Sequence, residues 1–141
     1  MNIHDLVNYP ELEKIIDKAK IKSYYQFEYQ KMIFTVFTHN HTKEDELAGN
    51  LPFFYKSHSS MGDYDIYIAK NISKKEFRKS ILLHETLEPF LREVLNFDES
   101  DENSLKIPHN IASEYDEKYA KSKMDNNLFS EYLKFKKDLT K

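Results

Sequence analysis

The chain has 141 residues, 40% of them hydrophobic and 32% charged, which suits one soluble domain with a single modest core. The net charge is −3 without a long basic block, so nucleic-acid binding is not favoured, and the two glycines exclude a P-loop or dinucleotide fingerprint. The absence of cysteine excludes disulfides and thiolate metal sites, so any zinc would be held by histidines and carboxylates.

No stretch of the sequence has the pattern of a targeting or membrane segment. The first residues lack the basic region and apolar run of a signal peptide, and no window of about 18 apolar residues occurs. We therefore expect a cytoplasmic protein that forms one domain over residues 1–141 and has no membrane partner.

The N-terminal part predicts a helix followed by strands. Residues 1–21 carry apolar side chains at helical spacing, and Pro10 suits the first helical position, with an acidic residue after it. The run Met-Ile-Phe-Thr-Val-Phe at 32–37 has the β-branched and aromatic composition of a strand. The aromatic residues between 22 and 29 fit either a strand or the end of a helix.

Residues 38–60 are expected to be irregular. His39 and His41 would share one face if the preceding strand continued, so they could bind a metal, although such a pair is more often a surface feature. Residues 43–46 are a charge run of the kind that solvates a loop. The segment 50–55 carries large apolar side chains on a loop or a short strand, and it could line a substrate groove or cover the core.

A strand at Asp63–Ala69 leads into the most regular helix, predicted from Lys74 to Phe97. Ser73 is a suitable N-cap residue, and Glu76 three positions later would complete a capping box. Pro89 lies inside this helix, where its missing N–H should bend the axis.

The middle of this helix reads Leu-His-Glu-Thr-Leu-Glu over residues 83–88. His84 and Glu88 lie one turn apart within an apolar stripe, where they need partners because burying them unpaired is costly. The i, i+4 spacing allows both to bind one metal ion, while Glu85 at the edge of the same arc would contact a water on that metal. Two other interpretations are open: a buried His84–Glu88 hydrogen-bonded pair without metal, and a solvated helix face.

Two helices are predicted after an acidic linker at residues 96–106. The first runs from His109 to Lys123 and would be opened by Ile107-Pro108. The last covers Asn126–Leu139, with an apolar stripe that would pack on the body of the domain. Together with the strands, these helices predict an α+β fold with a small, mostly antiparallel sheet and about four helices.

His109 could supply a third ligand beside His84 and Glu88, because helices joined by a short connection commonly pack as antiparallel neighbours. Two imidazoles and one carboxylate are the ligand set of catalytic zinc sites that leave a fourth position for water. Glu85 would then be the general base that passes the proton to the leaving amine. Asp116, on the same helix face as His109, could orient the site or be a fourth ligand, which would close it. Fe²⁺ or Mn²⁺ could use the same ligands.

These motifs resemble the compact zincin-type metallopeptidases, most closely the minimal forms common in phages and mobile elements. In those proteins a His-Glu-x-x-Glu helix is followed by an Ala-His-x-x-Ala-x-x-x-Glu helix. The likeness spans Asp63 to Ala120, with Pro108 and Asp116 in place of the Ala before the histidine and the Glu after it. The resemblance implies a zincin-like fold, zinc on the three ligands named above, Glu85 as the catalytic residue, and a substrate peptide lying antiparallel beside the strand at 64–69.

Two functions follow from these patterns. The first is a zinc-dependent hydrolase that cleaves a peptide or protein substrate through a metal-activated water. The second is a non-enzymatic phage or mobile-element protein that binds and inhibits a host protein, with the ligand cluster as a structural or relic metal site. The ten tyrosines and ten phenylalanines would then supply the interface.

Overall fold

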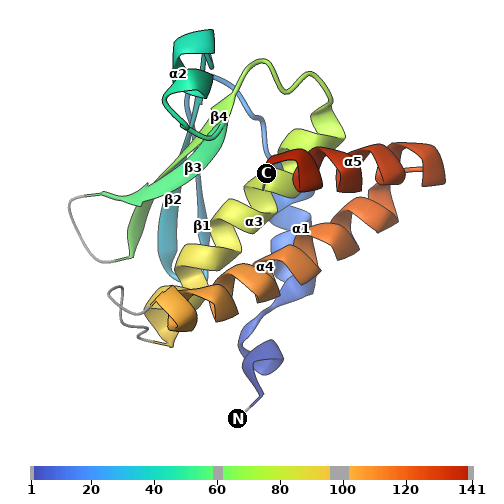
Figure 1. Ribbon diagram of the computed structural model, residues 1–141. Helices are drawn as coiled ribbons and strands as arrows, with labels where there is room; N and C mark the ends of the chain where they lie inside the picture. Colours follow the sequence, from blue (N-terminus) through green and yellow to red (C-terminus); the bar gives the residue numbers. More distant parts are fainter. Residues whose placement is uncertain (1, 59–61, 96–101, 140–141) are drawn as a thin grey trace.

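The computed structural model describes residues 2–58, 62–95 and 102–139, with the backbone alone over residues 102–105. These ranges contain one four-stranded sheet and five α-helices (Figure 1), which confirms the α+β class. The strands are β1 (Tyr25–Tyr29), β2 (Met32–His39), β3 (Phe53–Ser57) and β4 (Asp63–Ala69). The helices are α1 (Tyr9–Lys18), α2 (Lys43–Leu47), α3 (Lys75–Val94), α4 (Glu102–Lys123) and α5 (Asn126–Leu139).

The sheet has the strand order β1-β2-β4-β3. Its outer pairs, β1 with β2 and β3 with β4, are antiparallel, which confirms a mostly antiparallel sheet. The central strands β2 and β4 run parallel, because the chain between them crosses over through α2 and the edge strand β3. One face of these central strands is fully buried through Phe34, Val36, Ile66 and Ile68.

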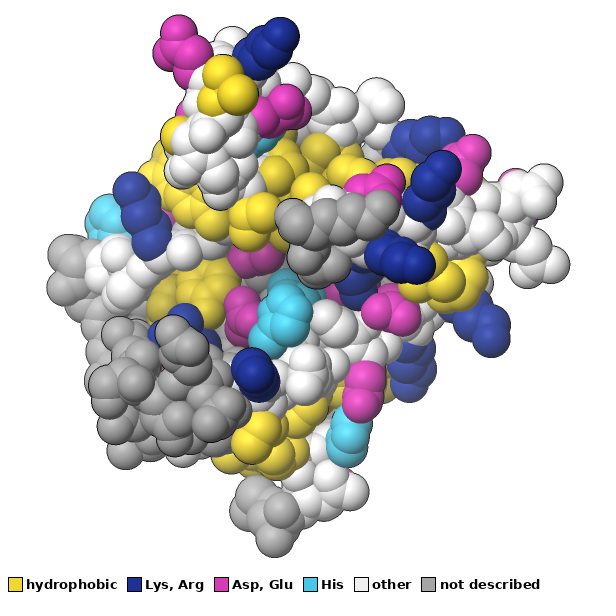
Figure 2. Space-filling model, in the orientation of Figure 1, with side chains coloured by type: hydrophobic (Ala, Val, Ile, Leu, Met, Phe, Trp, Pro, Cys, Tyr) yellow, Lys and Arg dark blue, Asp and Glu magenta, His cyan; other side chains and the backbone are white. Residues whose placement is uncertain are grey.

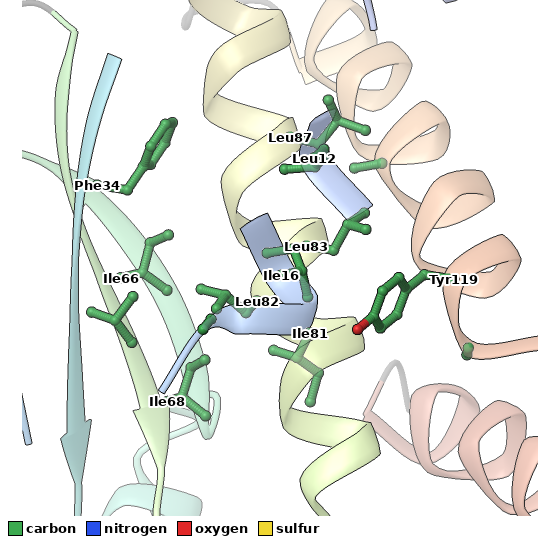
Figure 3. Close-up of a cluster of buried hydrophobic side chains, with 14 of the residues drawn as sticks. Leu12, Ile16, Phe34, Ile66, Ile68, Ile81, Leu82, Leu83, Leu87 and Tyr119 are labelled. Atoms are coloured by element: carbon green, nitrogen blue, oxygen red, sulfur yellow. The ribbon is translucent and has the colours of Figure 1, made fainter. Parts of the chain in front are cut away.

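The helices α1, α3, α4 and α5 lie on one side of the sheet (Figure 1). Leu82 of α3 points toward Ile66 and Ile68 of the sheet, whereas Leu83 lies near Ile16 of α1 (Figure 3). Because α3 is covered on several sides, every residue from 80 to 87 is buried. A polar side chain in this part of the helix therefore contacts other protein groups rather than bulk water.

The beginning of α3 differs from the prediction. The sequence predicts Ser73 as the N-cap residue with a capping box to Glu76, but this is wrong because Lys74 is the N-cap residue and no side chain caps the helix. Glu76 is then one position short of the third helical residue that a capping box uses. Lys74 instead donates to the carboxylate of Glu131 in α5 across 3.0 Å. The predicted helix end at 96–97 lies outside the described residues.

The second long helix, α4, begins earlier than predicted. The sequence places its start at His109, opened by Ile107-Pro108, but the helix begins at Glu102 and passes through Pro108, as α3 passes through Pro89. The prediction is wrong because a proline removes a single backbone donor, and packing can hold the neighbouring turns in place. The part of the predicted acidic linker before Glu102 lies outside the described residues. The bounds of α5 agree with the prediction.

The segment 38–60, predicted to be irregular, contains α2 and β3. The charge run at 43–46 is helical because Thr42 caps it: the Thr42 hydroxyl accepts from the Asp45 N–H, and the Asp45 carboxylate accepts from the Thr42 N–H. β3 forms an edge of the sheet, while β4 is flanked by β2 and β3. The implied pairing of a peptide with β4 is therefore wrong, because its hydrogen-bonding edges are occupied, and β3 offers an edge instead.

The N-terminal helix, predicted over residues 1–21, is confirmed only over α1. Asn8 caps this helix by accepting from the N–H of Glu11 over 3.2 Å, and Pro10 lies in its first turn. Residues 3–6 form a separate 3₁₀ turn. Within the described residues, no helix combines the length and apolar character needed to cross a membrane.

Candidate metal centre

The middle of α3 carries His84 and Glu85, which are only 6% and 5% exposed. The prediction of a solvated helix face is therefore wrong for these residues. Both line a cavity of about 520 Å³ that is bordered by α3, α4, α5 and the edge strand β3. Figure 2 shows histidine and carboxylate side chains beside hydrophobic ones in a hollow on this face of the molecule.

His84 and Glu88 of α3 meet His109 of α4 at one wall of this cavity. One potential ligand atom from each of the three residues lies within 4.8 Å of the others. His109 Nδ1 is 2.9 Å from a Glu88 oxygen, and the two imidazole rings are 4.9 Å apart between centroids. Two imidazole nitrogens and a carboxylate oxygen at these separations could hold a metal ion. The structure thus brings together all three predicted ligands.

The buried hydrogen bond between His84 and Glu88 that the sequence left open is not formed. His84 Nε2 lies 4.0 Å from Glu88, which is too long for a hydrogen bond. Glu88 is hydrogen-bonded to His109 instead, and His84 is hydrogen-bonded to Asp116. Glu88 and Asp116 therefore occupy different sides of the His84 ring.

Asp116 is the buried partner that orients His84. Its carboxylate accepts from His84 Nδ1 at 2.7 Å, from the Tyr132 hydroxyl at 2.9 Å and from Lys136 Nζ at 2.8 Å. With Nδ1 donating to a carboxylate, the lone pair of His84 stays on Nε2, the nitrogen on the side of Glu88. Asp116 is thus placed as an orienting residue and is absent from the ligand group found among the described residues.

Tyr132 and Lys136 also contact this centre, which was not predicted from the sequence. Both belong to α5, whose stripe indicated only a packing helix. Lys136 also contacts Glu117 of α4 at 2.7 Å. Tyr132 and Lys136 are four residues apart and so lie on one face of α5. This spacing could have suggested that both contact the same residue of a neighbouring helix.

Glu88 and His109 form a hydrogen-bonded pair in which each side chain favours the charged form of the other. Burial by itself would raise the pKa of Glu88, but the hydrogen bond from His109 and the charges of His84 and His109 lower it overall. The hydrogen bond to Glu88 correspondingly raises the pKa of His109. The side chain of His109 is 55% exposed, so this part of the cluster is accessible from solvent.

Glu85, the predicted catalytic residue, lies in the same cavity as the three potential ligands. Burial raises the pKa of its carboxyl well above the usual range, and the negative charges of Glu88 and Asp116 raise it further. A cation in the cluster would act in the opposite direction, because it stabilises a nearby carboxylate. The protonation of Glu85 therefore depends on whether a cation occupies the cluster of His84, Glu88 and His109.

The aromatic run at 53–55 lines the cavity, which agrees with the groove interpretation of that segment. The Tyr55 hydroxyl accepts from Arg92 of α3 and lies close enough to Glu88 for their electrostatic interaction to matter. Burial and the charge of Glu88 raise the pKa of the Tyr55 hydroxyl, so it stays protonated and can donate. Sequence reasoning did not predict roles for Tyr55 and Arg92.

The histidine pair at the end of β2 lies apart from this centre. The rings of His39 and His41 are 6.3 Å apart between centroids, and neither residue belongs to the ligand group found among the described residues. His39 instead contacts the rings of Phe54 and Tyr67.

The fold and the site together define an α+β domain with a His-Glu-His cluster that could hold a metal ion at the wall of a cavity. Comparisons of the chain with protein-family models, with curated proteins and with solved structures find no match. A functional proposal is therefore based on the geometry of this centre and on the motifs in the sequence.

Proposed function

We propose that the protein is a zinc-dependent hydrolase of peptide bonds. The observation that supports this most is the cluster of His84, Glu88 and His109 in a cavity that also contains Glu85. Two histidines and one carboxylate are the protein ligands of many catalytic zinc sites, and three ligands leave a position for water. Fe²⁺ and Mn²⁺ accept the same ligand types, and we choose zinc because this ligand set with an open position for water is the one that hydrolytic zinc sites use.

Zinc, when bound, would act as a Lewis acid toward water and toward the peptide carbonyl. Glu85 would accept a proton from the attacking water and later donate it to the leaving amine. The water oxygen becomes part of the new carboxyl group as the C–N bond breaks, so the products are a carboxylic acid and an amine. Asp116 would hold His84 in the correct tautomer.

The edge strand β3 would position the substrate. An extended peptide can add its backbone to a free strand edge, and β3 lies along the cavity that contains the cluster. The scissile carbonyl would thereby be held over the cavity.

The test of this proposal is cleavage of a peptide library by the purified protein, followed by mass spectrometry. We expect cleavage that is abolished by a chelator and restored by added zinc. If the zinc-loaded protein cleaves no peptide, the proposed hydrolysis is refuted.

Asp116→Asn is expected to weaken zinc binding by roughly 10- to 100-fold, the range typical of partners that orient a ligand histidine. The amide is neutral and no longer fixes the proton on His84 Nδ1 as a carboxylate does. Zinc affinity can be measured by competition with a chromophoric chelator. Glu117→Gln is the matched control, because Glu117 also contacts Lys136 but not His84. Equal affinities in the two variants would contradict an orienting role for Asp116.

A second candidate function is binding of a host protein, and the aromatic side chains on the sheet favour it. Phe37 and Phe54 stack on opposite sides of Tyr67, with ring centroids 5.2 and 4.9 Å away. Tyr24, which contacts Phe37, is 62% exposed. Exposed aromatic rings are enriched in the hot spots of protein interfaces.

Chelation distinguishes the two candidate functions. If the metal is structural, its removal unfolds the domain, and no peptide is cleaved before or after. If the protein is a hydrolase, chelation abolishes cleavage, and reloading with zinc restores it.

A further inference from the structure

We propose that the cavity beside the cluster of His84, Glu88 and His109 receives a large apolar side chain of the substrate. The protein would then cleave extended polypeptide segments next to residues such as leucine or phenylalanine, by the hydrolysis described above. This inference rests on the proposed peptidase function and names its substrate class. It is supported by the apolar walls of the cavity, by their closeness to the cluster, and by the pairing of the charged side chains.

Apolar side chains from several elements line this cavity of about 520 Å³. They are Leu51 and Phe53 from the chain that enters β3, Ile81 of α3, and Leu133 and Leu139 of α5. Leu51 and Leu133 are 48% and 38% exposed although they line a concave site. Figure 2 shows hydrophobic side chains around the hollow that contains histidine and carboxylate groups. Apolar surface in a hollow of this kind marks a place where a ligand can cover it.

Ile81 connects these apolar walls with the cluster. It lies three residues before His84 and four before Glu85 on α3, and side chains at these spacings are neighbours on a helix surface, about 5–6 Å apart. An extended peptide advances by about 3.3 Å per residue. When the scissile carbonyl of a peptide on the edge of β3 lies at the cluster, a side chain one or two residues away therefore reaches the apolar walls.

Charged side chains at the cavity wall bond to one another. Glu88 is hydrogen-bonded to His109, and Lys136 contacts Asp116 at 2.8 Å and Glu117 at 2.7 Å. A charged substrate side chain would have to break one of these pairs or lie against the leucines without a partner, and both are unfavourable. A large apolar side chain has neither cost and removes apolar surface from water.

The test compares peptides of one sequence in which the positions up to two residues from the cleaved bond carry leucine, asparagine or alanine in turn. Leucine and asparagine have nearly the same shape, so their comparison isolates polarity. At one of these positions we expect the zinc-loaded protein to cleave the leucine peptide roughly 10- to 100-fold faster, the ratio that corresponds to burying one large aliphatic side chain. The measured quantity is kcat/KM, and mass spectrometry of the products locates the cut.

Leu133→Asn tests whether this cavity produces the preference. The substitution places an amide in the apolar wall and should lower the ratio of leucine to asparagine cleavage several-fold. Leu47→Asn is the matched control, because Leu47 is also an exposed leucine of a helix but lies outside the cavity lining. Circular dichroism confirms that both variants are folded. A Leu133→Asn variant that keeps the wild-type ratio would overturn the assignment of the preference to this cavity.

Binding provides a measurement that does not depend on cleavage. Fluorescence anisotropy of the labelled leucine and asparagine peptides is followed as the inactive Glu85→Gln variant is added. The leucine peptide should bind more tightly, and addition of Leu133→Asn to Glu85→Gln should reduce the difference.

The outcomes distinguish this inference from the function on which it rests. Cleavage of the leucine, asparagine and alanine peptides at equal rates would overturn the apolar site and leave the peptidase proposal standing. Tighter binding of the leucine peptide without any cleavage would overturn hydrolysis and support the apolar site. Neither binding nor cleavage would overturn both.

Discussion

His84→Ala and His109→Ala are each expected to abolish stoichiometric zinc binding, whereas the wild-type protein should carry about one zinc ion per chain. Each substitution removes one of only three protein ligands, so the loss of affinity should exceed the roughly 100-fold upper range for an orienting partner. The measurement is elemental analysis of the purified proteins after reconstitution with zinc and desalting.

His58→Ala is the matched control for these variants. His58 bonds to Asp65 on the sheet and takes no part in the ligand group among the described residues. His84 is buried, so circular dichroism has to confirm that His84→Ala is folded; the side chain of His109 is 55% exposed, so its removal should disturb packing less. A wild-type protein that binds no zinc, or a His109→Ala variant that keeps it, would rule out the shared site.

Glu85→Gln is expected to lower the rate of peptide cleavage by about 10²- to 10⁴-fold, the usual contribution of a general acid–base group. Glutamine has nearly the same shape as glutamate but cannot accept the proton of the attacking water. Zinc content should be unchanged, because Glu85 is not one of the three potential ligands. The rate is measured on the best substrate from the peptide library.

Glu76→Gln provides the control for this substitution. Glu76 lies in the first turn of the same helix, away from the cavity, and should leave the cleavage rate unchanged. If Glu85→Gln cleaves peptides as fast as the wild-type protein, Glu85 is not the general base. If it loses zinc together with activity, the carboxyl contributes to metal binding, contrary to the roles proposed here.

The features that the sequence predicted correctly are mostly local. The spacing of His84 and Glu88 places them on one face of a helix whatever the rest of the chain does, because a helical turn has 3.6 residues. The apolar stripe of α5 similarly gives its bounds at Asn126 and Leu139. The strand at Asp63–Ala69 follows from its alternating β-branched and aromatic residues.

The predictions that failed concern element ends and strand neighbours. Ser73 does not cap α3, and Pro108 does not start α4, because contacts with other helices compete with these local preferences. β4 lies inside the sheet rather than at its edge, since β3 was hidden in a segment with weak strand character. Cross-strand pairing is a long-range property that one strand's sequence does not specify.

The sequence by itself therefore determined the α+β class and the two candidate ligands that share one turn of α3. Only the tertiary structure decided that His109 reaches Glu88, that Asp116 bonds to His84, and that Lys136 of α5 joins Asp116. The physical reason is distance along the chain: these pairs are separated by 20 to 32 residues. Their meeting depends on how α3, α4 and α5 pack rather than on any local propensity.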